Sequence, residues 1–310
     1  MLGLMSEPHA GSAHLHPDAN SRRLATALAL IVAFMVAEVV AGILANSLAL
    51  VSDAAHMLTD AAALVLSLVA LRLAARPARG NLTFGLKRAE ILSAQVNGAL
   101  LLVLAALIVY EAIRRLLDPA TVGGWTVVIV ALGGLVVNFV ATRELAGANR
   151  ENMAVEGSFL HLLTDLYAFA ATLLAGVVIV ATGFERADPI ASLFVAALML
   201  WAAESLLRAS GRVLLEMSPA GMDVAEIGRA LADHPRVASV HDLHVWEIGS
   251  GFPALSAHVL VPPGDDCHGI RRELENLLGE RFRIAHTTLQ VDHERSGELL
   301  SVEPLRDRAP

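Results

Sequence analysis

Long runs of apolar residues dominate roughly the first two thirds of the chain. Six such segments, at about residues 24–45, 48–71, 90–113, 125–142, 155–182 and 189–207, each come close to the roughly 20 residues that an α-helix needs to cross a bilayer. Short polar breaks such as Asn46-Ser47 and Asp118-Pro119 separate them. The pattern predicts a transmembrane domain of six α-helices over residues 22–210.

After about residue 210 the pattern changes to mixed charge and shorter amphipathic elements. A helical period at residues 223–234 is followed by strand-like segments at 237–248 and 254–261, a second helix at 267–282 and a third strand at 287–292. The order α-β-β-α-β predicts a small α+β domain over residues 211–295, with helices on one face of an open sheet. So small a core is marginal, and dimerisation would stabilise it. The polar segments 1–21 and 296–310 are expected to be disordered tails.

Composition agrees with a membrane location. The chain is 55% hydrophobic and only 17% charged, with a mean hydropathy of +0.58, which is more apolar than a typical soluble domain. The net charge of −8 argues against nucleic acid as a partner, because phosphate binding needs a basic surface. The single cysteine, Cys267, permits no intramolecular disulfide. Membrane lipid is therefore the expected surrounding of the helical domain.

Lysines and arginines are distributed unequally between the two sides of the predicted bundle. Eleven lie near the helix ends on the side that holds both termini, and three lie on the other side, namely Arg114, Arg115 and Arg186. Cytoplasmic loops of membrane proteins carry the excess of basic residues, so both termini are expected in the cytoplasm. Together with the compact loops, this orientation fits a multi-pass protein of a bacterial inner membrane.

Two copies of the pattern H-x-L-T-D lie inside predicted spans. His56 and Asp60 belong to one copy, and His161 and Asp165 belong to the other. Residues i and i+4 share one face of a helix, so each copy presents an imidazole and a carboxylate in the same direction. An aspartate at the centre of a membrane helix costs about 2.5–3.5 kcal/mol on insertion scales. The repetition of so costly a pattern favours a function over a packing role.

The four side chains would converge on one ion if the second and fifth helices pack together. Two imidazole nitrogens and two carboxylate oxygens suit tetrahedral Zn²⁺, and the two carboxylates would neutralise its charge. Because the imidazoles must be neutral and the carboxylates ionised to bind the metal, protons compete with it. The repeated motif thus predicts a protein that moves zinc and uses protons to release it.

Other polar residues inside the predicted spans leave their roles open. Asp53 shares a face with His56 and Asp60, so it either lines the ion path or makes a polar contact at the water boundary. Asn97 and Asn138 are either donors that orient the aspartates or hydrogen-bonding contacts between helices. The sequence alone allows both interpretations.

At these residues the chain resembles the cation diffusion facilitator family, in its zinc-transporting branch. Residues 46–60, NSLALVSDAAHMLTD, resemble the signature of that family, and residues 83–92, TFGLKRAEIL, resemble the start of its third helix. The resemblance covers about residues 20–293. It implies a homodimeric, proton-coupled antiporter that exports Zn²⁺ from the cytoplasm and is not an enzyme. It carries the transport site onto His56, Asp60, His161 and Asp165.

The resemblance also implies a cytoplasmic, metallochaperone-like C-terminal domain, with Zn²⁺ as a regulatory ion. The family's cytoplasmic ligands map to His241, His258 and Asp292. Gln290 occupies the position of a third-strand histidine, for which His286 or His293 could substitute. No histidine lies between residues 72 and 90, so the additional loop site of some members is not expected.

Alternatives to zinc antiport differ in their chemistry. A metalloprotease would need a motif such as H-E-x-x-H, which this chain does not contain. A non-transporting membrane metal sensor would signal through the C-terminal domain. A transporter of broader specificity would carry Cd²⁺ or Co²⁺ through the same site. Metal flux into vesicles separates transport from sensing, and competition between metals separates narrow from broad specificity.

Overall fold

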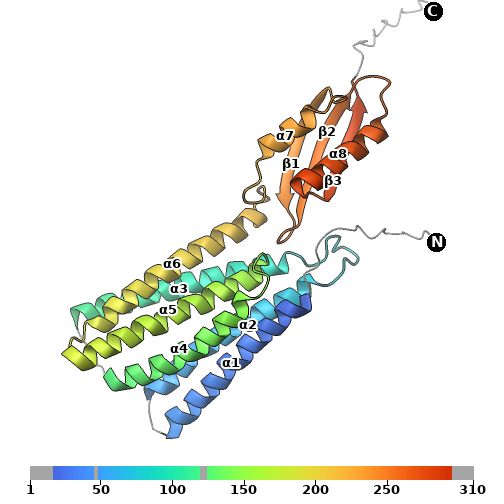
Figure 1. Cartoon of the computed structure of the whole chain (residues 1–310). Coiled ribbons are helices and arrows are strands. Elements are labelled where there is room, and N and C mark those ends of the chain that lie inside the picture. The colour runs from blue at the N-terminus through green and yellow to red at the C-terminus, as the bar shows by residue number, and fades with distance from the viewer. Residues whose placement is uncertain (1–16, 45–47, 119–123, 295–310) are drawn as a thin grey trace, which may run out of the picture. The chain divides into compact units, whose positions relative to one another are not determined.

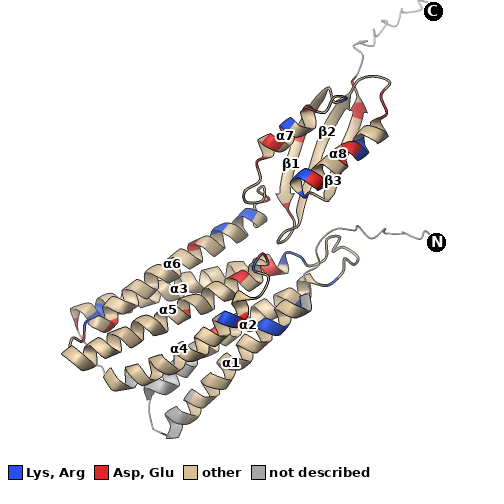
Figure 2. Ribbon diagram, in the orientation of Figure 1, with Lys and Arg blue, Asp and Glu red and all other residues tan. Residues whose placement is uncertain are grey.

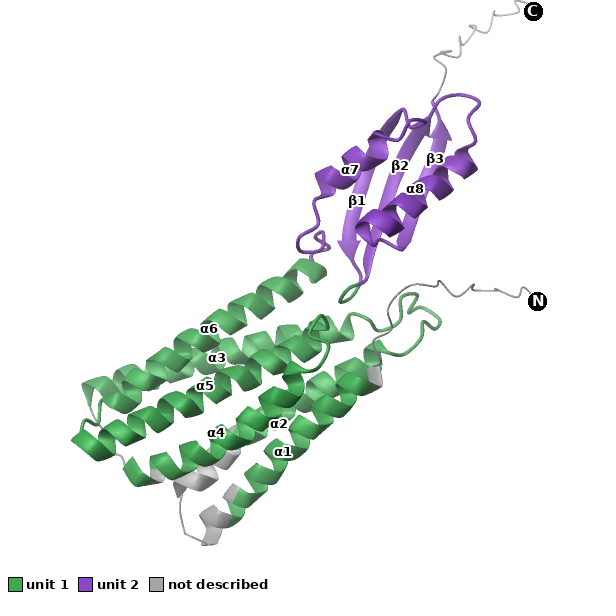
Figure 3. Cartoon of the chain, in the orientation of Figure 1, with its two compact units in different colours: residues 1–214, 249–251 green, residues 215–248, 252–310 purple. Residues whose placement is uncertain are grey.

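The computed structural model describes residues 17–44, 48–118 and 124–294, apart from the side chains of residues 17–18, 38, 41–44, 48–56, 59 and 126. The chain forms two compact units, shown in Figure 3. The first comprises residues 1–214 together with 249–251, and the second comprises residues 215–248 and 252–310. The boundary between the helical part and the C-terminal part therefore lies at Leu214 and Leu215.

The first unit is a bundle of long helices (Figure 1). They are α1 (Pro17–Leu44), α2 (Leu48–Ala74), α3 (Ala89–Leu117), α4 (Gly124–Ala146), α5 (Met153–Thr182) and α6 (Ala187–Leu214). Helices α1 and α2, α3 and α6, and α4 and α5 form the most extensive pairs. Helix α5 also contacts α2, α3 and α6, so it is the element that most of the bundle shares.

Within the described residues, five helices are long and apolar enough to cross a membrane. These are α3, α5 and α6 over their whole lengths, α1 at Ala19–Ala37 and α4 at Val127–Ala146. Figure 2 shows most of their charged residues toward the helix ends. Large apolar side chains point outward, for example Leu107 at 59% and Ile129 at 68% exposure, as a lipid-facing surface requires. The expected sixth span, α2, is a helix whose side chains at residues 48–56 lie outside the described residues.

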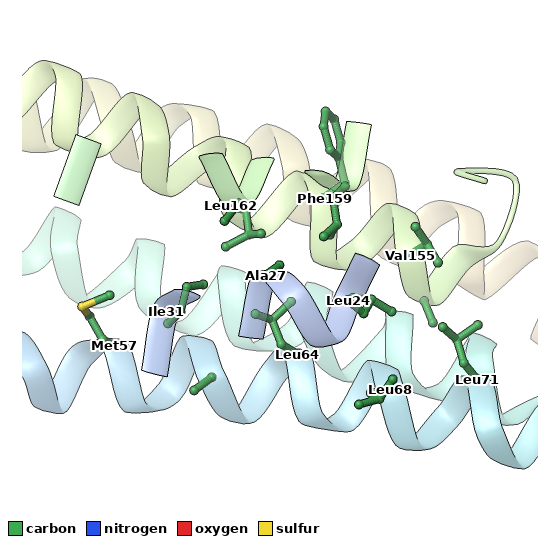
Figure 4. Packing of buried hydrophobic residues seen from close by; sticks show 14 residues of the cluster. Leu24, Ala27, Ile31, Met57, Leu64, Leu68, Leu71, Val155, Phe159 and Leu162 are labelled. Atoms are coloured by element: carbon green, nitrogen blue, oxygen red, sulfur yellow. The ribbon is translucent and has the colours of Figure 1, made fainter. Parts of the chain in front are cut away.

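Buried apolar side chains hold the helices together in two clusters. One joins α1, α2, α4 and α5, and Figure 4 shows Leu24 and Ile31 of α1 near Leu64 of α2 and Leu162 of α5. All four are 1% exposed or less. The other cluster joins α3, α5 and α6 around Leu101. Because α5 contributes to both clusters, packing on two sides fixes its position and rotation.

Helix α1 begins inside the segment that the sequence predicted as a disordered tail. It starts at Pro17 rather than near residue 22, and proline is favoured in the first turn of a helix because no partner is available there for an N–H. Asn20 Oδ1 accepts a hydrogen bond from Asn149 N at 2.9 Å, and Arg23 Nη1 donates to Glu144 O at 2.9 Å. These long-range contacts order the first turns. The rest of the expected tails, at 1–16 and 295–310, lies outside the described residues.

The second unit has the predicted α-β-β-α-β order. Its elements are α7 (Val224–Ala232), β1 (Ser239–Glu247), β2 (Pro253–Val261), α8 (Cys267–Phe282) and β3 (His286–His293). Strand β2 lies between the other two, antiparallel to β1 and parallel to β3. A parallel pair cannot be joined by a tight hairpin, and α8 provides the crossover. The prediction of a small α+β domain is confirmed.

This sheet has one covered face and one open face. Leu255, Ala257 and Val259 of β2 are buried in a core shared with α7 and α8. The intervening residues Ser256 and His258 are only partly buried and lie on the opposite side. Alternation along a half-buried strand therefore determines which histidines reach the open face.

Leu274→Ala is expected to lower the free energy of unfolding of the second unit by about 2–5 kcal/mol, because the Leu274 side chain is fully buried between α8 and the sheet. Trp246 reports this unfolding by fluorescence once the other two tryptophans, Trp125 and Trp201, are replaced by phenylalanine. Glu280→Ala, at an exposed position of α8, is the control and should change stability by less than ~0.5 kcal/mol. Equal effects of the two substitutions would contradict the core assignment.

Candidate metal centres

A buried cluster of one histidine and two carboxylates lies between α2 and α5. Asp60 comes from α2, and His161 and Asp165 come from α5. His161 Nε2 lies 3.0 Å from Asp60 Oδ1 and 3.7 Å from Asp165 Oδ2. All three possible ligand atoms lie within 4.8 Å of one another. Residues of both H-x-L-T-D copies therefore meet at one place.

The electrostatics of this cluster fit a cation. Asp60 is 6% exposed, His161 is 3% exposed, and the side chain of Asp165 is 12% exposed. Two ionised carboxylates carry two negative charges, while the imidazole supplies at most one positive charge. Buried charge that is not compensated is costly, so the cluster needs protons or a metal ion. A divalent cation would balance both carboxylates at once.

The local sequence explains why these groups face one another. His161 and Asp165 lie four residues apart and so share one face of α5. The threonine between them, Thr164, donates its hydroxyl to His161 O at 2.7 Å, which satisfies it within the helix. Met57 and Leu64 of α2 are 2% and 1% exposed, so apolar groups on both sides of Asp60 exclude water from the helix interface.

The remaining ionisable residue of the two H-x-L-T-D copies is His56 of α2. Position 56 lies on α2 one turn before Asp60, but the side chain of His56 is outside the described residues. The same holds for the side chain of Asp53. Helical spacing alone puts both positions on the face of α2 that carries Asp60.

A second group of possible ligands lies on the open face of the C-terminal sheet. His241 of β1 and His258 of β2 are cross-strand partners whose ring centroids are 5.1 Å apart. Asp242 Oδ2 lies 3.2 Å from His241 Nδ1 and 3.6 Å from His258 Nδ1. All three side chains are about half exposed or more. Two nitrogens and one carboxylate in water could hold a divalent ion in exchange with the solvent.

Asp242 belongs to this group of possible ligands, although the sequence pattern did not indicate it. The ladder between β1 and β2 shifts register between His241 and His244, and Asp242 adopts a φ of +50°. Aspartate tolerates this left-handed conformation better than most residues. In a regular strand, neighbouring side chains point to opposite faces, so the bulge is what lets Asp242 and His241 approach the same point. The sequence pattern offered no sign of the bulge.

The expected ligands Asp292 and His286 lie outside this group. Gln290 is the β3 residue opposite His258, and its Nε2 donates to Asp292 Oδ2 at 2.7 Å. His286 lies four residues before Gln290, about 13 Å along the strand, and its ring is 5.6 Å from that of Phe252. Among the described residues, the carboxylate beside both histidines is that of Asp242 from β1, and a ligand role for Asp292 or His286 stays a prediction. The register of the parallel pair, which the sequence does not encode locally, places Gln290 rather than a histidine opposite His258.

The fold and the buried cluster define a multi-pass membrane protein with a candidate cation site inside its helix bundle. The chain belongs to the cation efflux family. A family model described as the cation efflux transmembrane domain matches residues 24–215, and one described as the cation efflux protein, cytoplasmic domain, matches residues 219–294.

Curated relatives match nearly the whole chain. The zinc transporter ZitB of Shigella flexneri is 39% identical over 91% of this chain and 91% of its own length. The cadmium, cobalt and zinc/H(+)-K(+) antiporter of Bacillus subtilis is 37% identical, covering 91% and 92%. The metal cation efflux system protein CzcD of Cupriavidus metallidurans is 38% identical, covering 91% and 90%. The predicted membership of the zinc-transporting branch is confirmed.

Removing Asp242 should weaken zinc binding to the C-terminal unit by about tenfold or more, since it takes away one of three ligands. The measurement is a zinc titration of the full-length protein carrying Asp60→Asn and Asp165→Asn, so that only the C-terminal group binds. Asp242→Asn and His258→Ala are compared with His286→Ala, which should leave the affinity unchanged. If His286→Ala lowers the zinc affinity and Asp242→Asn does not, the ligands are those expected from the family resemblance, and Asp242 is not one of them.

Proposed function

We propose that the protein exports Zn²⁺ from the cytoplasm of a bacterial cell in exchange for protons. The observation that carries this proposal is the buried cluster of Asp60, His161 and Asp165 among membrane-spanning helices. A purely structural role would leave two carboxylates and one imidazole without charge balance. The names of the relatives, which include zinc transporters and a metal–proton antiporter, support the cargo and the coupling.

In this proposal, Zn²⁺ binds between α2 and α5 with His56 as its fourth ligand. Zinc binds histidine nitrogens and carboxylate oxygens and prefers four ligands in a tetrahedral arrangement. Helix α2 is the sixth span, so an even number of crossings places both termini on one side. The excess of lysine and arginine on that side assigns it to the cytoplasm.

Proton exchange follows from the same ligands. His161 Nε2 lies 3.0 Å from Asp60 Oδ1, within reach of a hydrogen bond that a proton on the imidazole would make. A proton in that place and a metal ion bound to Nε2 exclude each other. Protons entering from the side opposite the cytoplasm therefore displace the ion, and their release to the cytoplasm prepares the site for the next ion.

The C-terminal unit would act as the regulatory and dimerising part. Zinc bound by His241, Asp242 and His258 would report the cytoplasmic concentration, because the group is open to solvent. The small core of this unit would be stabilised by pairing with a second copy. A broader cargo that includes Cd²⁺ and Co²⁺ is the second candidate, favoured by the name of the Bacillus subtilis relative.

Asp60→Asn and His161→Ala are each expected to reduce zinc uptake to the level of protein-free vesicles. The measurement is zinc uptake into proteoliposomes with an acidic lumen. Protein molecules whose cytoplasmic side faces outward would carry zinc into this lumen as protons leave it. Tyr167→Phe changes a half-exposed residue of α5 close to the cluster and should retain full flux. Zinc uptake that persists in Asp60→Asn and His161→Ala alike would refute the site. Binding without flux in the unaltered protein would favour a sensor.

Zinc affinity of the membrane site should fall as the pH falls, because protons occupy the imidazoles and carboxylates that bind the ion. The C-terminal group is removed by Asp242→Asn and His258→Ala, and zinc binding is titrated between about pH 8 and about pH 6, around the ordinary pKa of histidine. The dissociation constant is expected to rise as the pH falls, by up to about tenfold per pH unit for each displaced proton once the pH is below the pKa of its ligand. Equal affinities at both ends of this range would contradict proton coupling.

A further inference from the structure

A buried polar cluster between α2 and α3 has no role in the function proposed above. Ser67 of α2 and Ser93 and Asn97 of α3 are each 2% exposed or less. Ser67 Oγ and Ser93 Oγ are 3.3 Å apart, and Asn97 Nδ2 donates to Ser67 Oγ at 3.2 Å. These contacts join α2 to α3 and satisfy one end of the Asn97 amide.

The other end of that amide is unused. Asn97 Oδ1 is buried and has no hydrogen-bond partner among the described residues. Exchanging the oxygen and nitrogen of the amide does not remove the problem, because one polar atom would still point away from Ser67. Buried polar atoms in folded proteins are normally paired, and an ordered water commonly supplies the missing partner.

Helix α5 contains the complementary group. His161 Nδ1 is likewise buried without a hydrogen-bond partner among the described side chains and backbone. The other nitrogen of this ring, Nε2, faces Asp60 and Asp165. A histidine that binds a metal through one nitrogen usually donates the hydrogen of the other nitrogen to an acceptor, which fixes its tautomer and its orientation. Among the described side chains, none supplies that acceptor for His161.

The two unpaired atoms belong to the same region of the bundle. A Cβ placed on Gly157 of α5 would lie 3.6 Å from Asn97 Nδ2, so the amide packs against this glycine. Gly157 precedes His161 by one turn, and helical side chains lean toward the N-terminus over the preceding turn. The His161 side chain therefore leans toward the turn that Asn97 contacts.

We propose that Asn97 is a positioning residue of the transport site, whose Oδ1 accepts the hydrogen of His161 Nδ1 through one bridging water. The inference rests on the proposed function, because it assigns His161 Nε2 to the metal. The water keeps the hydrogen on Nδ1, so the lone pair of Nε2 points toward Asp60 and Asp165. Asn97 thus acts on the ion without touching it.

Asn97→Leu is expected to weaken zinc binding to the membrane site by about 10- to 100-fold, the usual effect of losing such a partner of a metal-bound histidine. The full-length protein carries Asp242→Asn and His258→Ala, so that only the membrane site binds. The matched control is Ser67→Ala, which breaks the contact between α2 and α3 but leaves Asn97 Oδ1 available. Its zinc affinity should stay within about threefold of the parent.

Bound Co²⁺ serves as the second readout, since its visible absorption reports ligand geometry at the ion. The spectrum should change in Asn97→Leu and remain that of the parent in Ser67→Ala. Asn97→Ala, which removes the amide without adding bulk, is measured in parallel and should behave like Asn97→Leu. Equal losses of zinc affinity in Ser67→Ala and Asn97→Leu would show that Asn97 only holds helices together. A lower melting temperature of the Asn97 variants with unchanged zinc affinity and Co²⁺ spectrum would show the same.

Zinc flux of His161→Ala, compared with zinc binding by the Asn97 variants, separates this inference from the proposed function. If His161→Ala retains zinc flux, the transport site itself is wrong. If His161→Ala abolishes flux while Asn97→Leu and Asn97→Ala leave zinc affinity and the Co²⁺ spectrum unchanged, the transport site stands and the role of Asn97 falls.

Discussion

Two carboxylates and one imidazole enclosed by apolar helices are the constraint on which the rest of the bundle depends. Asp60 and Asp165 approach His161 from two different helices, and burial leaves little water to screen their charge. Charge in such surroundings is tolerated only with a partner at a defined distance. The buried contacts of Leu64 and Leu162 hold α2 and α5 at that distance. Packing and electrostatics therefore support each other at one point in the fold.

The two candidate metal groups differ in a way that suits different tasks. Among the described residues, the cluster in the bundle is almost fully buried, so it exchanges little with the surrounding water. His241, Asp242 and His258 lie in water on an open sheet face, so an ion there equilibrates with its surroundings. An enclosed site is suited to carrying an ion between two compartments. An open one is suited to responding to the concentration in a single compartment.

Local patterns were enough to predict much of this molecule. Apolar runs of membrane length gave the helices, and the change to alternating periods gave the α-β-β-α-β order, because both depend on spacing within one element. The i, i+4 spacing put His161 and Asp165 on one face of a helix. Side-chain chemistry then pointed to a zinc-like ion. Membership of the cation efflux family agrees with the division into a transmembrane and a cytoplasmic domain.

Only the tertiary structure decided which groups meet. Asp60 and His161 are 101 residues apart, and their contact exists because α2 and α5 share an apolar core. Asp242 reaches its neighbours through a bulge, and the register of β3 leaves His286 away from them. The unpaired oxygen of Asn97 is likewise a property of how α3 meets α5. Sequence determines the elements and the chemistry that each carries, whereas long-range packing determines distance and burial, because these depend on residues far apart in the chain.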